Sequence, residues 1–109
     1  MLNLYGIKSC DTCRKALKLL RESGRNVAFR DVREEPLPPE TIERFLANFG
    51  QRLINDRSTT WRSLTETEKN RLPVDLLARH PTLMKRPVIE DGEALTLGWD
   101  KAVQARYLG

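Results

Sequence analysis

The sequence predicts an α/β protein in which a β-α-β unit and a β-β-α unit flank a helical segment. Residues 2–7 and 26–32 have the short apolar and polar pattern of strands. Two further strand-like segments, 86–90 and 94–97, follow the helical middle of the chain. With 109 residues, the chain fits one compact domain with a small insertion.

The helix between the first two strands is predicted within residues 8–24. One of its faces is apolar at helical spacing, through Cys13, Ala16, Leu17 and Leu20. Ser, Asp and Thr near its start are common capping residues, and Gly24 supplies a C-terminal stop. A β-α-β crossover of this kind indicates two parallel strands.

Residues 38–81 are interpreted as a helical insertion. An amphipathic stretch covers 41–49, and the segment 73–81 begins with a Pro at a first helical position. The intervening residues 59–72 are polar, with three apolar anchors at Trp61, Leu64 and Leu72.

Beyond the insertion, the pair Asp91-Gly92 predicts a hairpin turn between the last two strands. A final helix is predicted over residues 99–108. The core is therefore expected to comprise residues 1–33 and 84–109, within a single domain of the whole chain.

The net charge is +4 at pH 7, and the pI is near 9.4. Residues 1–50 carry nine Lys/Arg and seven Asp/Glu, and residues 51–109 carry ten and eight, so the charge is evenly spread. Direct nucleic-acid binding needs a clustered basic surface, and we do not expect it. No membrane span or signal peptide is apparent, so the expected location is the cytoplasm, away from the membrane.

Cys10 and Cys13 are the only cysteines, and they stand where the first strand passes into its helix. A disulfide between residues this close in sequence would close only a very short loop and would not link distant parts of the chain. The pattern therefore favours redox or nucleophilic chemistry over a structural disulfide. A helix N-terminus stabilises a thiolate, and Lys8, Arg14 and Lys15 add positive charge nearby. Cys10 is therefore the predicted nucleophile.

Cys13 has two interpretations. It follows Cys10 by one helical turn, as a resolving thiol would, and it also belongs to the apolar stripe, as a small buried residue would. A zinc site is not expected, because such a site needs about four ligands and only His80 and carboxylates remain. His80 is interpreted as a helix-end residue that contacts the last carbonyls, rather than as a general base.

Arg86-Pro87 is the second candidate feature. A Pro that enters a strand often marks an edge or a special turn. Arg86 and Arg57 are candidate ligands of an oxyanion, because a guanidinium pairs with such groups through two parallel hydrogen bonds.

Three stretches together resemble the arsenate reductase (ArsC) and Spx superfamily: YGIKSCDTCRKALKLL, NDRSTTWRSL and HPTLMKRPVI. The resemblance is greatest to its YffB-like branch of small thiol reductases, and it spans nearly the whole chain. It implies a thioredoxin-like fold with a helical insertion and a cis peptide bond before Pro87. In the reductases, a cysteine at the place of Cys10 attacks arsenate, arginines stabilise the oxyanion, and glutathione with glutaredoxin resolves the adduct.

By this resemblance, Cys10 and Arg86 match motif positions directly, and Arg57 matches an arginine of the Spx and YffB branches. Cys13 resembles the second cysteine of the Spx redox switch.

The chain also departs from the arsenate reductases. Their counterpart of this second arginine lies slightly earlier, where this chain has Asn55, and their third arginine would fall near Gly98 or Trp99, where none is present. The resemblance therefore weakens arsenate as the substrate.

The predicted function is a thiol-dependent reductase or oxidoreductase, acting as a monomer without a bound cofactor or metal. Cys10 is the nucleophile, and Arg86, Arg57 and Lys8 bind an anionic or thiol substrate. Glutathione is the candidate co-substrate and glutaredoxin a candidate partner. One alternative is an arsenate reductase coupled to glutaredoxin.

A second alternative is an Spx-type regulator that binds RNA polymerase and senses oxidation through Cys10 and Cys13. The basic C-terminal extension associated with Spx is missing, since the chain stops at Gly109. The regulator is therefore less expected than the reductase.

Overall fold

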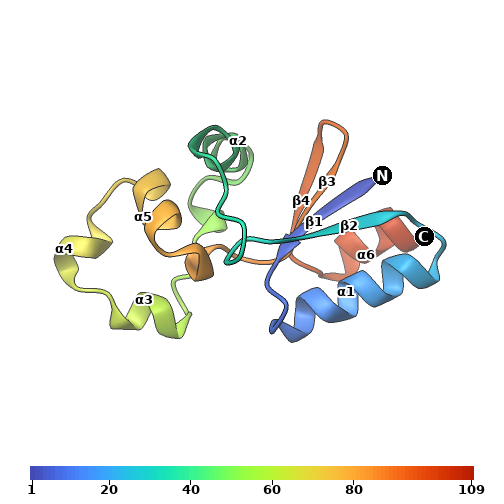
Figure 1. The fold of residues 1–109 in the computed structure, drawn as a ribbon, viewed down its shortest axis with the longest axis horizontal. Helices are drawn as coiled ribbons and strands as arrows, with labels where there is room; N and C mark the ends of the chain where they lie inside the picture. The colour runs from blue at the N-terminus through green and yellow to red at the C-terminus, as the bar shows by residue number, and fades with distance from the viewer. The chain divides into compact units, whose positions relative to one another are not determined.

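The computed structural model describes all 109 residues and divides into two compact units (Figure 1). The first unit comprises Met1–Asp31 and Arg86–Gly109, and the second comprises Val32–Lys85. The expected core segments, 1–33 and 84–109, end within two residues of these boundaries. Each unit encloses buried apolar side chains of its own.

The first unit is built on a four-stranded sheet of order β2-β1-β3-β4. β1 (Leu2–Gly6) pairs in parallel with β2 (Val27–Asp31), as a β-α-β crossover requires. β3 (Val88–Asp91) is antiparallel to β1 and to β4 (Ala94–Leu97). The parallel pairing of β1 with β2 and the antiparallel pairing of β3 with β4 are the two strand pairings that the sequence predicted.

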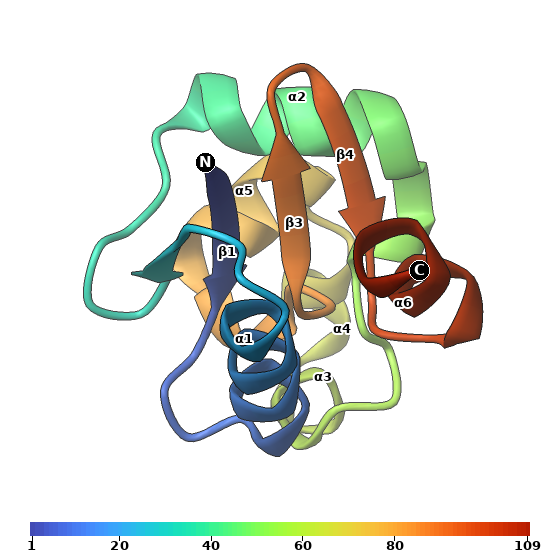
Figure 2. The same ribbon diagram turned by 90° about the vertical axis from the view of Figure 1, so that its right-hand side faces the viewer.

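Two helices, α1 (Asp11–Glu22) and α6 (Lys101–Leu108), lie on one face of this sheet (Figure 2). Their buried side chains form one cluster with those of the strands, namely Leu2, Leu4, Cys13, Ala16, Leu20, Ile89, Val103 and Tyr107. Full burial of a leucine side chain contributes about 1.5–3 kcal/mol, so this cluster is the main source of stability for the first unit. The apolar stripe predicted for α1 is confirmed by the burial of Cys13, Ala16 and Leu20.

The hairpin between β3 and β4 turns one residue later than predicted. Asp91 pairs with Ala94, so the two-residue loop is Gly92-Glu93 rather than Asp91-Gly92. Gly92 has a φ of 62°, a backbone conformation that glycine adopts without a steric cost. Two-residue hairpins that match the twist of their strands need such a residue at the first loop position.

The second unit is helical, with elements α2 (Pro39–Phe49), η1 (Gly50–Leu53), α3 (Thr59–Ser63), α4 (Glu66–Lys69), α5 (Pro73–Arg79) and η2 (Pro81–Leu83). Ser58 and Thr65 each accept a hydrogen bond from a backbone N–H of the next turn, and so they begin α3 and α4. None of the helices of the protein is long and apolar enough to cross a bilayer.

Leu72 is not the apolar anchor that the sequence predicted. It is 66% exposed and occupies the N-cap position of α5, immediately before Pro73. At an N-cap the side chain stands outside the helical stripe, so the apolar face of α5 begins later, at Leu76 and Leu77.

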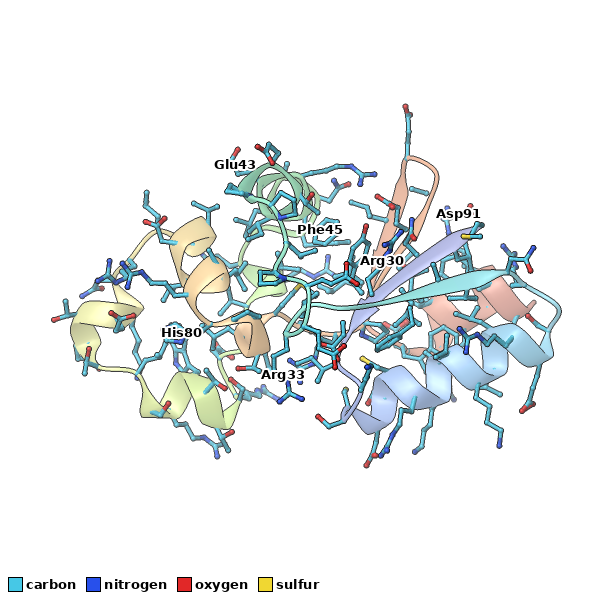
Figure 3. All side chains as sticks on the ribbon, viewed as in Figure 1. Arg30, Arg33, Glu43, Phe45, His80 and Asp91 are labelled. Carbon is cyan, nitrogen blue, oxygen red and sulfur yellow. The ribbon has the colours of Figure 1, made fainter.

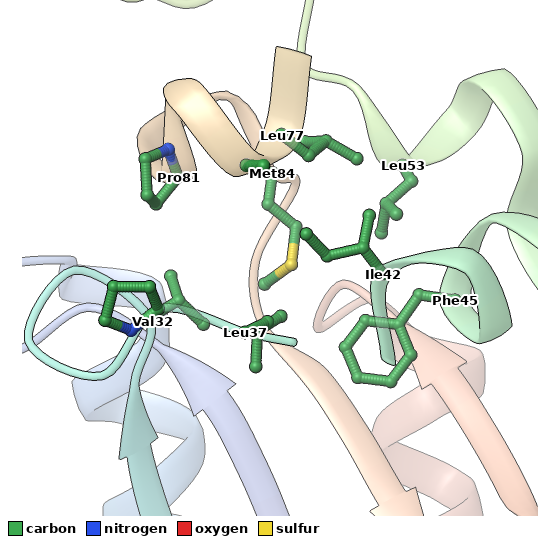
Figure 4. Close-up of a pocket in the computed structure, with 10 residues that line it drawn as sticks. Val32, Leu37, Ile42, Phe45, Leu53, Leu77, Pro81 and Met84 are labelled. Atoms are coloured by element: carbon green, nitrogen blue, oxygen red, sulfur yellow. The ribbon is translucent and has the colours of Figure 1, made fainter. Parts of the chain in front are cut away.

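A small cavity of about 20 Å³ lies in the core of the second unit (Figure 4). Apolar side chains enclose it, including those of Leu37, Phe45, Leu77 and Met84. A cavity needs roughly 10–15 Å³ to hold one water, so this one has room for about one water and for no larger ligand. The cavity is therefore a packing gap rather than a ligand site.

Candidate active site

Cys10 occupies the N-cap position of α1, at the end of the loop that leaves β1. Its backbone N–H donates to the carbonyl of Ile7 at 3.0 Å, and its own carbonyl accepts from the N–H of Arg14 at 3.0 Å. The side chain is partly exposed and makes no standard capping hydrogen bond. The helix start therefore acts on this sulfur chiefly when it is a thiolate, because the first N–H groups and the helix dipole attract negative charge.

Opposing effects set the pKa of the Cys10 thiol, and their sum lowers it. Partial burial raises the pKa, but hydrogen bonding from the backbone N–H and the thiol of Cys13 stabilises the thiolate, as does the guanidinium of Arg86 by hydrogen bonding and charge. The positive charge that stabilises the Cys10 thiolate thus comes mainly from Arg86, rather than from the neighbours in sequence that were expected to supply it. Arg14 pairs instead with Asp11 on the exposed side of the helix.

Cys13 has the opposite character. Its side chain is 0% exposed, and burial raises its pKa to about 12, with a further contribution from the adjacent Cys10. The N–H of Ile7 and the charge of Arg86 oppose this increase without cancelling it. Cys13 therefore remains a protonated thiol, which donates to Cys10 rather than competing with it for negative charge.

Gly6 is a site residue that the sequence analysis missed. A Cβ atom added to Gly6 would overlap the Sγ of Cys13, so the close approach of α1 to the end of β1 requires a residue without a side chain. The one available signal was a glycine at the end of an apolar strand immediately before the cysteines.

Arg86 and Pro87 enter β3 on the first unit, and the peptide bond between them is cis. Pro87 is buried, and its carbonyl accepts a hydrogen bond from the N–H of Gly98 at 2.8 Å. The guanidinium of Arg86 interacts with the sulfur of Cys10 through a hydrogen bond and through its charge. Of the predicted residues, Cys10, Cys13 and Arg86 come together around one sulfur.

Lys8 contributes to this site through its backbone. The backbone N–H of Lys8 donates to Oδ2 of Asp31 at 2.9 Å. Lys8 is otherwise exposed to solvent. Asp31 is buried at the end of β2. As a single polar residue within a predicted strand, it carries no sequence signal that marks it as part of the site.

Arg57 belongs to the second unit. It is exposed, and its backbone N–H donates to Oδ1 of Asn55 at 3.1 Å. Arg57 lines an open surface groove together with two other cations of this unit, Arg52 and Lys85. Asp56 also lines the groove, so its three cations face one carboxylate and the charge of its lining is positive, as an anionic ligand requires.

His80 also belongs to the second unit, among the short helices α3, α4 and α5 (Figure 3). His80 is the C-cap of α5, and its backbone N–H donates to the carbonyl of Leu76 at 2.8 Å, as expected of a helix-end residue. Its side chain lies elsewhere, with Nε2 3.2 Å from Oε2 of Glu68. The contact with His80 and a second one from Arg71 lower the pKa of the Glu68 carboxyl. No group of three or more His, Cys, Asp or Glu side chains is arranged to hold a metal ion.

Residues 5–106 match the ArsC family. The chain belongs to the ArsC family. It is 42% identical over 113 residues to an uncharacterised protein of Haemophilus influenzae, a match that covers 98% of this chain and 99% of the relative. It is also 30% identical to the global transcriptional regulator Spx of Listeria innocua, over 99% of this chain and 87% of the regulator.

Solved structures place this ArsC-family chain in the YffB-like branch. The structure of the protein YFFB covers 100% of both chains with a TM-score of 0.91 and 33% identity. An arsenate reductase (ArsC) related protein from Brucella melitensis has a TM-score of 0.75 and 34% identity, over 97% of this chain and 92% of that one. A glutaredoxin from Archaeoglobus fulgidus, with a TM-score of 0.53 and 14% identity over 97% and 83% of the two chains, shares the fold alone. The predicted thioredoxin-like fold is therefore confirmed.

Proposed function

We propose that this ArsC-family chain is a thiol-dependent oxidoreductase in which the Cys10 thiolate is the nucleophile. The observation that carries the proposal is the lowered pKa of Cys10 at the start of α1, where Cys13 and Arg86 stabilise the thiolate against the effect of burial. The thiolate, not the thiol, attacks sulfur and other electrophiles. The Cys10 sulfur is partly exposed, so a substrate can reach it, and its lowered pKa favours the reactive thiolate.

In the first proposed step, the thiolate attacks the glutathione sulfur of a mixed disulfide between glutathione and another thiol compound, which is the candidate substrate. The bond between Cys10 and that sulfur forms, the substrate S–S bond breaks, and the other sulfur leaves as a thiolate with the electron pair. In the second step, another thiolate attacks the substrate sulfur and releases Cys10. The net reaction is an exchange in which the attacking thiol enters a disulfide and one substrate sulfur is reduced.

An external thiol, rather than Cys13, is the proposed attacker in the second step. Cys13 is 0% exposed and its pKa is raised to about 12, so it presents almost no thiolate at neutral pH. Glutathione is the candidate for this role, and glutaredoxin is the candidate protein partner. The reaction is proposed to occur in the cytoplasm on a monomer, without a bound cofactor.

Arg86 is proposed to bind the anionic part of the substrate in addition to stabilising the thiolate. A guanidinium offers a planar fork of donors that fits a carboxylate or a tetrahedral oxyanion. Lys8 is proposed to assist through its positive charge. Arg57 is proposed to bind an anion in the groove of the second unit that it lines with Arg52 and Lys85.

Mass spectrometry after incubation with oxidised glutathione tests this function. The wild-type chain and Cys13→Ser should each gain one glutathione, and a thiol added later should remove it. Cys10→Ser should gain none. A chain that forms no adduct, or that forms it on Cys13, would refute the assignment of Cys10.

An Spx-type redox regulator is the second candidate. The observations that favour it are the C-x-x-C pair and the 30% identity to Spx over 99% of the chain. A regulator of this kind would retain RNA polymerase in a pull-down, and retention would change on oxidation of Cys10 and Cys13. The oxidoreductase requires neither result, so the pull-down separates the two functions.

A further inference from the structure

Asp31 is the one charged side chain that the protein buries, with 5% of its surface exposed. Removing a carboxylate from water is costly unless hydrogen bonds compensate for the lost hydration. A buried carboxylate beside the loop that carries the nucleophile therefore calls for a function that an apolar residue could not supply.

The sheet register explains how Asp31 reaches this loop. Asp31 ends β2 and is in register with Gly6, which ends β1. Residues in register on neighbouring strands direct their side chains to the same face of a sheet. Gly6 lies on the face of the sheet against which Cys13 of α1 packs. The Asp31 carboxylate is therefore on the same face of the sheet as α1.

The carboxylate holds this loop at its second residue. Oδ2 of Asp31 accepts the N–H of Lys8 at 2.9 Å, and the N–H of Cys10 is held by the carbonyl of Ile7 at 3.0 Å. Hydrogen bonds to a charged acceptor are about twice as strong as neutral ones. Between β1 and α1 the loop spans only residues 7–10, so a fixed Lys8 restricts where Cys10 begins the helix.

We propose that Asp31 is a positioning residue for the nucleophile, because its buried carboxylate holds the 7–10 loop and thereby keeps the Cys10 sulfur at the start of α1 beside Arg86. The role rests on the proposed function, in which Cys10 is the attacking group. Asp31 touches neither the substrate nor the Cys10 sulfur in this account. It acts through the backbone of Lys8.

Three variants separate this role from a general loss of stability. Asp31→Ala removes the acceptor of the Lys8 N–H. Asp31→Asn keeps an oxygen at the same place without the charge. Ile89→Val weakens the core of the same unit on β3, away from the loop, and serves as the stability control. Each variant is alkylated with iodoacetamide, a neutral probe, over a range of pH, and hydrogen exchange reports on the Lys8 amide.

We expect Asp31→Ala to slow alkylation of Cys10 at neutral pH by about tenfold, since a misplaced reacting group loses one to two orders of magnitude in rate. The pH profile should move to higher pH, and the Lys8 amide should lose protection. Ile89→Val should keep a wild-type profile, and Asp31→Asn should lie between wild type and Asp31→Ala, because a neutral acceptor holds the Lys8 N–H more weakly than a carboxylate.

Three results would overturn the positioning role: wild-type reactivity in Asp31→Ala, an equal loss in Ile89→Val, or a loss in Asp31→Asn as large as in Asp31→Ala. The proposed function fails separately, because it fails in the wild-type chain. If wild-type Cys10 reacts only as an ordinary thiol, then there is no nucleophile to position and both proposals are wrong.

Discussion

The Sγ atom of Cys13 packs against Gly6 at a place where any side chain on residue 6 would overlap it. Gly6 is thus a spacer that lets the first turn of α1 approach the end of β1. This approach buries Cys13 completely and brings its thiol to Cys10. The backbone of Gly6 does not have a positive φ, so the need for glycine here is one of space.

Gly6→Ala should therefore destabilise the protein through overpacking, by about 1–3 kcal/mol. Because the overlap is with the sulfur, Cys13→Ala should relieve part of the cost when it is combined with Gly6→Ala. Urea unfolding of the two single variants and the double variant measures this coupling. Strictly additive changes in the free energy of unfolding would show that the contact is not the cause.

Cys13→Ala should raise the pKa of Cys10, because the thiolate loses the thiol hydrogen bond that Cys13 donates. Cys13→Ser keeps a donor at this position and should raise it less. Both variants should still form a glutathione adduct that external thiol removes, since Cys13 is not needed for resolution in this account. A Cys13 variant whose adduct can no longer be removed would instead identify Cys13 as the resolving thiol.

Arg86→Lys keeps the positive charge but replaces the planar fork of donors with a single ammonium group. We expect the reaction with oxidised glutathione to slow by about tenfold or more, because lost contacts to developing charge cost a few kcal/mol. Arg106→Lys, an exposed position on α6 of the same unit, is the matched control and should react normally. Equal rates for the two variants, measured by stopped-flow with oxidised glutathione, would remove Arg86 from the site.

Arsenate should be a poor substrate or none. Where the resemblance to the reductases implies arginines, this chain has Asn55 and the Gly98-Trp99 pair, and Trp99 packs against the apolar cluster of the first unit. Each missing charged contact costs about a hundredfold in rate. Turnover of about 1–1000 per second in a glutaredoxin-coupled arsenate assay, the usual range for enzymes, would contradict this prediction.

Local patterns in the sequence predicted the elements of the first unit because these elements bury one face. The apolar stripe of α1 includes Cys13, Ala16 and Leu20, and all three are buried as the stripe requires. The same pattern placed Cys10 at the helix start, where the structure has it as the N-cap. The cis bond before Pro87 was implied only by the resemblance, since no local pattern distinguishes it from a trans bond.

The features that escaped the sequence analysis depend on contacts between distant elements. Asp31 is buried because its strand ends beside the loop of Lys8, and Gly6 is required because α1 crosses it closely. Neither contact produces a periodic pattern of apolar residues in the sequence, which is the signal that identified the helices and strands. Leu72 was misassigned for a local reason, because composition alone does not distinguish an exposed N-cap leucine from the apolar stripe that follows it.

Titration of the Cys10 thiol shows whether its thiolate is stabilised. The pKa of Cys10 is lowered, so the thiolate should persist as the pH falls below the ordinary thiol range, and reactivity should be lost only when the pH falls through the lowered value. The measurement is the rate of iodoacetamide alkylation at Cys10 against pH, with thiolate absorbance as a second readout and Cys10→Ser as the blank. We expect a midpoint clearly below that of an ordinary thiol, which is about 8.5. A midpoint at or above that value would contradict a stabilised thiolate.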